Sequence, residues 1–235
     1  MSSQLPLALR WPAQQRFDSF VTGDGNETAL ALARGAARGE MAWLYFAGPA
    51  GSGKSHLLLA ACAEASARDR HAQYVSLAKL AGGQEAAIRS LGGSDLLALD
   101  DVGTIAGSAQ AEHALFDLYN RCKVDKSTLL FAAGAPPAQL GIGLPDLVSR
   151  LSSCTQATLK PLDDAARREA VRRRAQARGL DLDEAVLDWL FAHTARDLGS
   201  QTELLERIDR AALAAQRRVT VPFLRNLLDA KTKNG

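Results

Sequence analysis

The sequence predicts an α/β fold, a parallel sheet flanked by helices, followed by a small all-α domain. Short apolar runs alternate with helical segments between residues 42 and 158, a pattern typical of doubly wound sheets. A glycine-rich loop joins the first apolar run to a helix. Beyond Pro161 the apolar runs stop and only helical patterns follow.

Five segments are expected to form the strands of the sheet. The run at 95–101 is apolar throughout, which predicts a strand covered on both faces. A helix is expected after Asn26 or Thr28, either of which can serve as its N-cap. The expected strands are 42–48, 72–78, 95–101, 127–134 and a strand-like segment in 154–162, and the remaining expected helices of this part are 54–67, 111–125 and 144–153.

The last part of the chain is predicted to be helical, with Gly179 and Gly199 as breaks. The boundary is placed near residues 159–163. The expected organisation is therefore an N-terminal segment (1–15), an α/β nucleotide-binding domain (16–160) and a helical domain (161–235). The four expected helices of the last domain are 163–179, 183–195, 200–218 and 220–231.

Composition excludes several classes of protein. The formal net charge of +2 gives no global field for nucleic acid, so a nucleic-acid site would have to be local. The three cysteines are far apart and form no metal-binding spacing, which predicts buried free thiols in a reducing compartment. No run approaches the roughly 20 apolar residues of a membrane helix, and no signal peptide is recognisable. A cytoplasmic protein without a membrane partner is expected.

The glycine-rich loop fits the pattern G-x-x-x-x-G-K-[ST] of a phosphate-binding loop. Its backbone N–H groups and the following helix N-terminus would hold phosphate oxygens. Lys54 would neutralise the β- and γ-phosphates and Ser55 would ligate Mg²⁺, so the expected cofactors are ADP or ATP with Mg²⁺. The residues expected at the nucleotide are Gly48, Pro49, Ala50, Gly51, Ser52, Gly53, Lys54, Ser55 and His56.

Two acidic residues end the third expected strand. Asp100 is expected to hold the metal through water, and Asp101 to orient a water for hydrolysis. One or both of these aspartates have a second interpretation, in which they cap the following turn.

Five segments of the sequence, in this order, carry a family resemblance: "RFDSF", "GSGKSHLL", "LDD", "FDLYNR" and "LPDLVSRL". Together they resemble the AAA+ ATPases related to the bacterial replication initiator DnaA, and most closely the Hda-type regulators, from about Gln4 to Leu228. The resemblance implies a AAA+ P-loop NTPase fold with a helical lid. It also implies a clamp-associated regulator that stimulates ATP hydrolysis by DnaA and so represses re-initiation of DNA replication.

The resemblance assigns further residues. Phe17, Phe20 and Val21 match the segment that walls the adenine site, although aromatic residues at this spacing also suit core packing. Arg150 matches the arginine finger, which acts in trans on a nucleotide bound by a neighbouring molecule; the alternative is an ordinary surface arginine.

Two positions depart from the family pattern. Gly134 stands where relatives carry a polar side chain that senses the γ-phosphate. Gly199 stands where they carry an arginine of the lid, and Arg196 is a nearby substitute. Weak intrinsic hydrolysis and stable occupancy by ADP are expected, so whether the chain is itself an enzyme stays open.

The N-terminal hexapeptide 4–9 resembles the peptides by which replication proteins bind the bacterial sliding clamp, the β subunit of DNA polymerase III. Its glutamine would form hydrogen bonds and its leucines would fill apolar pockets. DNA would then be a partner only indirectly, through the clamp; a terminal strand or tail is the alternative. The residues expected to bind are Gln4, Leu5, Leu7 and Leu9.

The helix at 163–178 is rich in arginine. Acidic residues at its start and basic residues at its end suit the helix dipole, so a solvated helix is the first explanation and contact with DNA or a partner the second.

Besides a non-ATPase scaffold, two rival functions stay open at this stage. One is a helicase-loader ATPase of the DnaC kind. The other is a DnaA-like initiator paralogue, which is disfavoured because DnaA carries a helix-turn-helix domain after its lid and this chain ends at Gly235. The sequence leaves the oligomeric state open, a homo-oligomer included.

Overall fold

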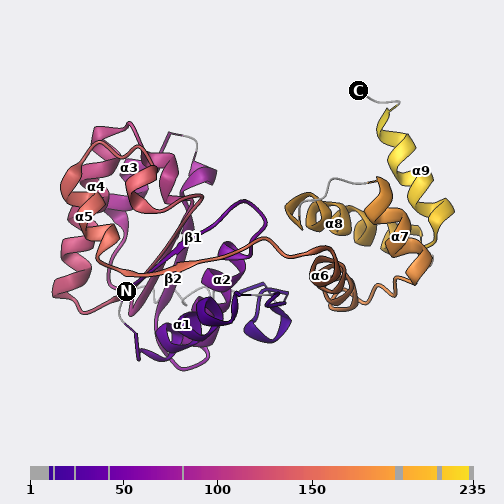
Figure 1. Cartoon of the computed structure of the whole chain (residues 1–235), viewed down its shortest axis with the longest axis horizontal. Helices are drawn as coiled ribbons and strands as arrows, with labels where there is room; N and C mark the ends of the chain where they lie inside the picture. The colour runs from indigo at the N-terminus through magenta and orange to yellow at the C-terminus, as the bar shows by residue number, and fades with distance from the viewer. Residues whose placement is uncertain are drawn as a thin grey trace, which may run out of the picture.

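The computed structural model describes residues 11–12, 14–23, 25–41, 43–80, 82–193, 198–215 and 219–232, without the side chains of 198–203, 213–215 and 228–232. It consists of an α/β unit and a group of helices, joined by an extended connection between the last strand and the first helix of that group (Figure 1).

The sheet confirms the α/β prediction. Its five strands are all parallel, in the order β2-β3-β4-β1-β5. Every residue of the third strand is buried, as its continuous apolar run predicts. The strands are β1 (Trp43–Ala47), β2 (Ala72–Ser76), β3 (Leu96–Asp100), β4 (Thr128–Ala133) and β5 (Thr155–Thr158).

Helices cover both faces of the sheet and create two apolar cores. Leu44 and Phe46 of β1 belong to the core under α1 (Glu27–Arg38) and α2 (Lys54–Ser66). Tyr45, the residue between them, belongs to the core on the opposite face, because successive side chains of a strand point to opposite sides. That face is covered by α3 (Gln84–Ser90), α4 (Ala109–Val124) and α5 (Pro145–Ser152).

Some elements were not expected from the sequence. Helix α3 has seven residues and buries only Ile88, so it carries no readable periodicity. Among the described residues, four short 3₁₀ helices also occur, and they are η1 (Phe17–Ser19), η2 (Leu77–Leu80), η3 (Val102–Ile105) and η4 (Pro137–Gln139).

The C-terminal helices enclose a core of their own, which includes Val171, Leu187 and Leu205. Gly179, with a φ of +74°, lies in the turn after α6, as predicted. The predicted break at Gly199 is wrong, because this residue lies in the first turn of α8. The cost of about 1 kcal/mol for a helical glycine is small beside the packing of a long helix. The helices are α6 (Asp164–Gln176), α7 (Glu184–His193), α8 (Leu198–Ala215) and α9 (Val221–Thr232).

Asn26 connects the start of the α/β unit to the connection that leads into the lid. It precedes α1, but its side chain does not cap that helix. Instead its amide nitrogen donates to the Lys160 carbonyl (3.0 Å) and its amide oxygen accepts from the Lys160 N–H (2.9 Å). Both bonds fix the backbone just before the lid.

Cys62, Cys122 and Cys154 are free and buried, as predicted. Burial raises the pKa of each thiol, and Cys154 reaches about 12, so none is a thiolate at neutral pH. Within the described residues, no helix combines the length and apolarity needed to cross a membrane.

Candidate functional site

The phosphate-binding loop lies between β1 and α2, at the carboxyl edge of the parallel sheet. Glycine is required at two positions of this loop, because neighbouring atoms lie too close to leave room for a Cβ. A Cβ on Gly48 would lie 2.6 Å from the Leu159 carbonyl oxygen, and one on Gly53 would lie 2.8 Å from the Phe20 ring. Gly51 and Gly53 also have left-handed φ angles of +76° and +100°. The loop therefore has the backbone of a phosphate cradle, placed at a helix N-terminus.

Lys54 bends back over this loop. Its Nζ donates to the carbonyl oxygens of Gly48 (2.7 Å) and Pro49 (2.8 Å). Burial lowers the pKa of Lys54, while Asp100 and Asp101 act in the opposite direction. Since an ammonium group has three donors, a phosphate in the loop can take the third or displace a carbonyl.

Asp100 and Ser55 come together at the end of β3. Asp100 is only 1% exposed. Its Oδ2 accepts from the Tyr74 hydroxyl and its Oδ1 from the Asp101 N–H, both at 2.9 Å. Burial raises the pKa of Asp100, and a hydrogen bond with Ser55 lowers it. A cation beside this carboxylate would offset its desolvation.

A magnesium ion would not be held here by side chains alone. In the described part of the chain, no three His, Cys, Asp or Glu side chains form a group that could hold a metal. Mg²⁺ usually keeps several waters and binds one or two carboxylates together with phosphate oxygens. Ser55 and Asp100 fit such a site only when a nucleotide supplies the phosphates.

Asp101 has structural partners. Its φ of +58° is left-handed, and it precedes the 3₁₀ turn η3. Its carbonyl accepts from the N–H and the hydroxyl of Thr104, at 2.9 and 2.8 Å. Its carboxylate accepts from the Ser76 hydroxyl at 2.9 Å. The geometry favours the turn-forming interpretation of Asp101.

His56 ties the N-terminal segment to α2. Its Nε2 lies 2.8 Å from the Arg16 carbonyl and its ring packs edge-on to Phe20 at 5.3 Å. The carbonyl accepts, so Nε2 carries a proton as donor. Burial lowers the pKa of His56 to about 4, and Arg174 contributes in the same direction. The imidazole is thus neutral at physiological pH.

A small pocket opens beside the loop, between the α/β unit and the lid. Phe20, Val21 and His56, all expected at the nucleotide, lie in its wall. Phe17 does not; it packs into the apolar core, with the Arg34 guanidinium 5.4 Å from its ring centre. The lining residues are Ser19, Phe20, Val21, Ser52, Gly53, His56, Leu162, Ala170 and Arg174.

Several of these residues were not expected at the site. Tyr74 and Ser76, which bond the two aspartates, lie on β2, in register with the end of β3. Tyr74 and Ser76 are two residues apart and so lie on the same face of β2, next to the two aspartates that end β3. This spacing was the sequence signal that could have identified them. Arg174 and Leu162 reach the pocket from beyond the domain boundary, and no motif marks them.

Arg150 lies elsewhere. It is an exposed residue of α5 and does not line the pocket beside its own loop. Its guanidinium lies 5.9 Å from the centre of the Tyr119 ring. That ring packs edge-on against Trp43 (4.3 Å), and its hydroxyl lies 3.3 Å from the Ser153 hydroxyl. The guanidinium of the exposed Arg150 therefore packs against the ring of a buried tyrosine.

The structure describes Gly134, one of the two positions at which this chain departs from the family pattern. A Cβ on Gly134 would meet nothing within 4 Å, so the missing side chain is not excluded by space. Arg196 and the hexapeptide 4–9 lie outside the described residues. Trp11, the first described residue, donates from Nε1 to the Ser66 hydroxyl at 2.9 Å, which fixes it at the end of α2.

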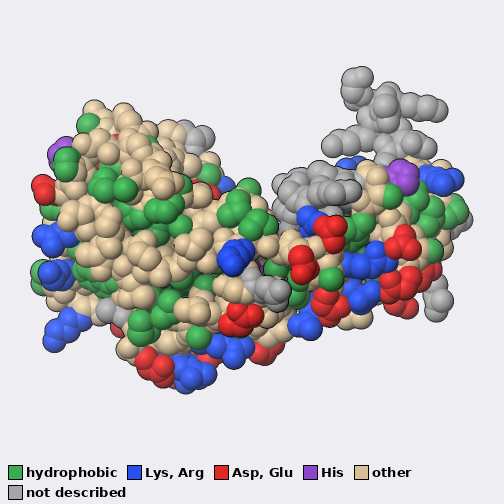
Figure 2. All heavy atoms as spheres, in the orientation of Figure 1, with side chains coloured by type: hydrophobic (Ala, Val, Ile, Leu, Met, Phe, Trp, Pro, Cys, Tyr) green, Lys and Arg blue, Asp and Glu red, His purple; other side chains and the backbone are tan. Residues whose placement is uncertain are grey.

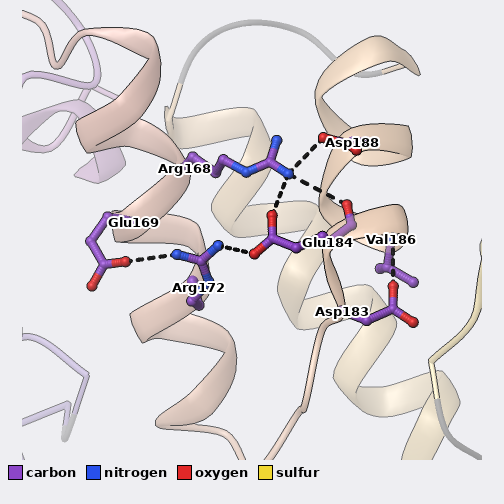
Figure 3. Close-up of polar contacts among 7 residues, drawn as sticks. All are labelled: Arg168, Glu169, Arg172, Asp183, Glu184, Val186 and Asp188. Atoms are coloured by element: carbon purple, nitrogen blue, oxygen red, sulfur yellow. Dashed lines mark hydrogen bonds and ion pairs between the residues drawn. The ribbon is translucent and has the colours of Figure 1, made fainter.

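Most of the arginine-rich helix is ion-paired within the lid. Arg168 bonds Glu184 (2.7 Å) and Asp188 (2.6 Å) of α7, and Arg172 bonds Glu169 (3.0 Å) and Glu184 (2.5 Å) (Figure 3). Basic and acidic side chains accordingly lie interleaved over these helices (Figure 2). Single exposed pairs contribute about 0–1 kcal/mol, but this network links α6 to α7. It favours the structural explanation of the basic run.

Comparison with known proteins identifies both parts of the chain. Residues 12–159, more than half of the chain, match the family described as the bacterial DnaA ATPase domain. Residues 164–228 match the lid domain of Hda.

Solved structures show the same fold. Domain III of Thermotoga maritima DnaA is 22% identical, with a TM-score of 0.77 over 94% of this chain and 98% of that one. DnaA bound to AMPPCP and single-stranded DNA is 24% identical, with a TM-score of 0.67 over 84% of this chain. This chain spans 65% of the length of that protein. The T. maritima RuvB branch migration motor is 19% identical, with a TM-score of 0.61 over 94% of this chain and 72% of that one. This chain belongs to the bacterial DnaA ATPase family and, with its Hda-type lid, is an Hda-type, DnaA-related AAA+ protein.

Proposed function

We propose that this chain is a clamp-tethered regulator that presents Arg150 to ATP bound on a neighbouring DnaA molecule. The added positive charge would stabilise the transition state of phosphoryl transfer on DnaA. Loss of ATP from DnaA would then repress re-initiation of replication.

The placement of Arg150 carries this proposal. Leu147 and Leu151 of α5 are fully buried against the α/β core, while Arg150 points outward. Tyr119 holds the guanidinium by a cation–π contact, whose strength is about 0.5–1 kcal/mol at an exposed site. An arginine finger that acts in trans must be exposed and preoriented, and Arg150 meets both conditions.

The chain's own loop is proposed to hold ADP or ATP with Mg²⁺. Supporting observations are the glycine cradle, Lys54 across it, and Ser55 beside the buried Asp100. Two of the DnaA structures of similar fold are bound to AMPPCP. The nucleotide would stabilise the active shape of the module.

Intrinsic hydrolysis is proposed to be slow. Gly134 offers no side chain to the γ-phosphate, and the Asp101 carboxylate is bonded to Ser76. Hydrolysis needs a group that orients the attacking water. The chain therefore acts mainly on its partner's nucleotide.

The hexapeptide containing Gln4, Leu5, Leu7 and Leu9 is proposed to bind the sliding clamp on DNA. Trp11 bonds to Ser66 at the end of α2, and Arg16 bonds to His56 near its start, so the chain that follows the hexapeptide is anchored to this helix. Tethering raises the effective concentration of the regulator near the replication machinery. These partners lie on chromosomal DNA, in the cytoplasm.

One reconstituted assay tests the proposal. Purified chain, clamp-loaded DNA and ATP-bound DnaA are mixed, and loss of ATP from DnaA is followed. Omitting the clamp, or changing Leu5 and Leu7 to Ala, should remove the stimulation. Arg121→Ala, an exposed arginine of α4, is the matched control for Arg150→Ala and should leave it intact. Stimulation without the clamp contradicts the tethering step. Binding to a replicative helicase in place of the clamp favours the helicase-loader alternative.

A further inference from the structure

Tyr74 contacts both residues that would serve a metal ion. It belongs to β2, and its ring packs against the apolar core under α1 and α2. Its hydroxyl donates to Oδ2 of Asp100 at 2.9 Å. The same hydroxyl is hydrogen-bonded with Ser55, in the first turn of α2, and Ser55 is also hydrogen-bonded with Asp100. One phenolic hydroxyl thus joins the end of β3 to the helix that follows the phosphate-binding loop.

Tyr45 shows how another tyrosine of this sheet satisfies its hydroxyl. It lies on β1, its ring belongs to the core on the opposite face, and its hydroxyl donates to the Ala135 backbone carbonyl at 2.8 Å. Tyr74 instead donates to a carboxylate that has lost nearly all of its water, since Asp100 is almost fully buried. A donor that reaches such a charge compensates part of its desolvation.

The bonds on Asp100 determine what this carboxylate can still do for a cation. Its Oδ1 accepts from the Asp101 N–H, and its Oδ2 accepts from Tyr74. Direct coordination of a metal by Oδ2 would compete with the Tyr74 bond. A hydrogen bond to a charged group contributes on the order of tenfold or more to an equilibrium constant, so this competition is costly. Accepting from a metal-bound water needs only a remaining lone pair, and the Tyr74 bond can stay.

This difference separates two common cations. Mg²⁺ dehydrates reluctantly and usually keeps several of its waters. Ca²⁺ takes more oxygen ligands and coordinates carboxylates directly. A carboxylate that is available only through water therefore favours Mg²⁺.

We propose that Tyr74 makes the metal site of the bound nucleotide selective for Mg²⁺ over Ca²⁺, because its hydroxyl keeps Asp100 from coordinating the ion directly. Tyr74 is a positioning residue, since it acts through Asp100 and does not ligate the ion itself. The inference rests on the nucleotide and Mg²⁺ binding proposed above.

Calorimetric titration of the full chain with ADP tests this, in Mg²⁺, in Ca²⁺, and in EDTA without either metal. Tyr74→Phe deletes only the hydroxyl and frees Oδ2 of Asp100. The wild type should bind ADP more tightly with Mg²⁺ than with Ca²⁺. Tyr74→Phe should lower the ratio of these two affinities about tenfold, mainly by tightening binding with Ca²⁺. Its affinity in EDTA should stay within about twofold of the wild type, which damage to the fold or to the phosphate-binding loop would not allow.

Two further variants sharpen the test. Tyr45→Phe is the matched control, because it deletes the same group from a tyrosine that bonds a backbone carbonyl, and its ratio should equal that of the wild type. Asp100→Asn removes the charge through which Tyr74 is proposed to act. In that background, adding Tyr74→Phe should leave the ratio unchanged.

Three results would overturn this inference alone. An equal ratio in wild type and Tyr74→Phe would show that the hydroxyl does not control the choice of metal. Equal losses of ADP affinity in Mg²⁺, Ca²⁺ and EDTA would show a purely structural role. An effect of Tyr74→Phe that persists in the Asp100→Asn background would show that Tyr74 does not act through the carboxylate.

Failure of the proposed function gives a different result. If the wild type bound no ADP under any of the three conditions, the proposed nucleotide site would fail together with this inference. If the wild type bound ADP equally with and without metal, the proposed metal site would fail with it. Both results differ from a normal metal dependence that Tyr74→Phe leaves unchanged.

Discussion

Glu112 is predicted to hold the helix that carries Arg150 in place. Its side chain is buried, and its Oε1 accepts from the N–H groups of Gly107 (2.9 Å) and Gly143 (3.1 Å). Its Oε2 accepts from the Leu144 N–H (2.9 Å), one residue before α5 begins. One carboxylate thus joins the start of α4 to the start of α5.

Glu112→Ala leaves these three N–H groups without their protein acceptor. A hydrogen bond to a charged group contributes about 1.5–3 kcal/mol, but Gly107 and Gly143 are exposed and Leu144 is half-buried, so water replaces much of the bonding and a loss of about 2–3 kcal/mol is expected. Glu112→Gln keeps the oxygen that serves Gly107 and Gly143 and replaces only the acceptor of Leu144, so about 1–2 kcal/mol is expected.

Urea unfolding measures both losses. Far-ultraviolet circular dichroism and the fluorescence of Trp43, in a background with Trp11 and Trp189 changed to Phe, would follow the α/β unit. Glu85→Ala on α3 is the control, because the Glu85 side chain is 42% exposed and pairs only with Arg89 of its own helix, so less than about 0.5 kcal/mol is expected. A cost below about 1 kcal/mol for Glu112→Ala would show that the carboxylate does not hold α5 in place, since one hydrogen bond to a charged group should contribute more than that.

Three further predictions concern the site. Lys54→Met removes the ammonium that crosses the loop and should weaken ADP binding at least about 100-fold by calorimetry, with exposed Lys79→Met unchanged. The folded state disfavours protonated His56, whose pKa is about 4 against 6.5, so the unfolded state binds more protons between these values. Stability is therefore full above pH 6.5 and falls by up to about 3 kcal/mol toward pH 4, and His56→Asn should flatten that slope in urea unfolding. Tyr119→Leu removes the ring under Arg150 and should lower stimulated hydrolysis on DnaA about fivefold without changing ADP affinity, whereas Tyr119→Phe should retain most of it.

The parts of the fold that were predictable have strong local signals. The five segments expected to be strands became the five strands, and the glycine loop marked the first strand–helix turn. Helix α3 was missed because its single buried residue, Ile88, leaves no pattern. Gly199 was misread because packing of α8 overrides a glycine's weak propensity.

The candidate site also contains some residues that the sequence predicts and others that it does not. Lys54, Ser55 and Asp100 belong to sequence motifs that predict phosphate and Mg²⁺ binding. The fold brings all three to one edge of the sheet. Arg174 and Glu112 depend on contacts between distant segments. Nothing in the arginine-rich run distinguishes Arg174 until the lid is folded against the loop.

A single-turnover measurement tests most directly whether Arg150 stimulates ATP hydrolysis on DnaA. DnaA is loaded with labelled ATP, the chain with unlabelled ADP, and both are mixed on clamp-loaded DNA. An arginine finger is worth on the order of 10³-fold or more in rate, so Arg150→Ala should lower the rate of ATP loss from DnaA by at least that factor relative to wild type. Equal rates for wild type and Arg150→Ala would show that Arg150 does not act on the ATP bound by DnaA.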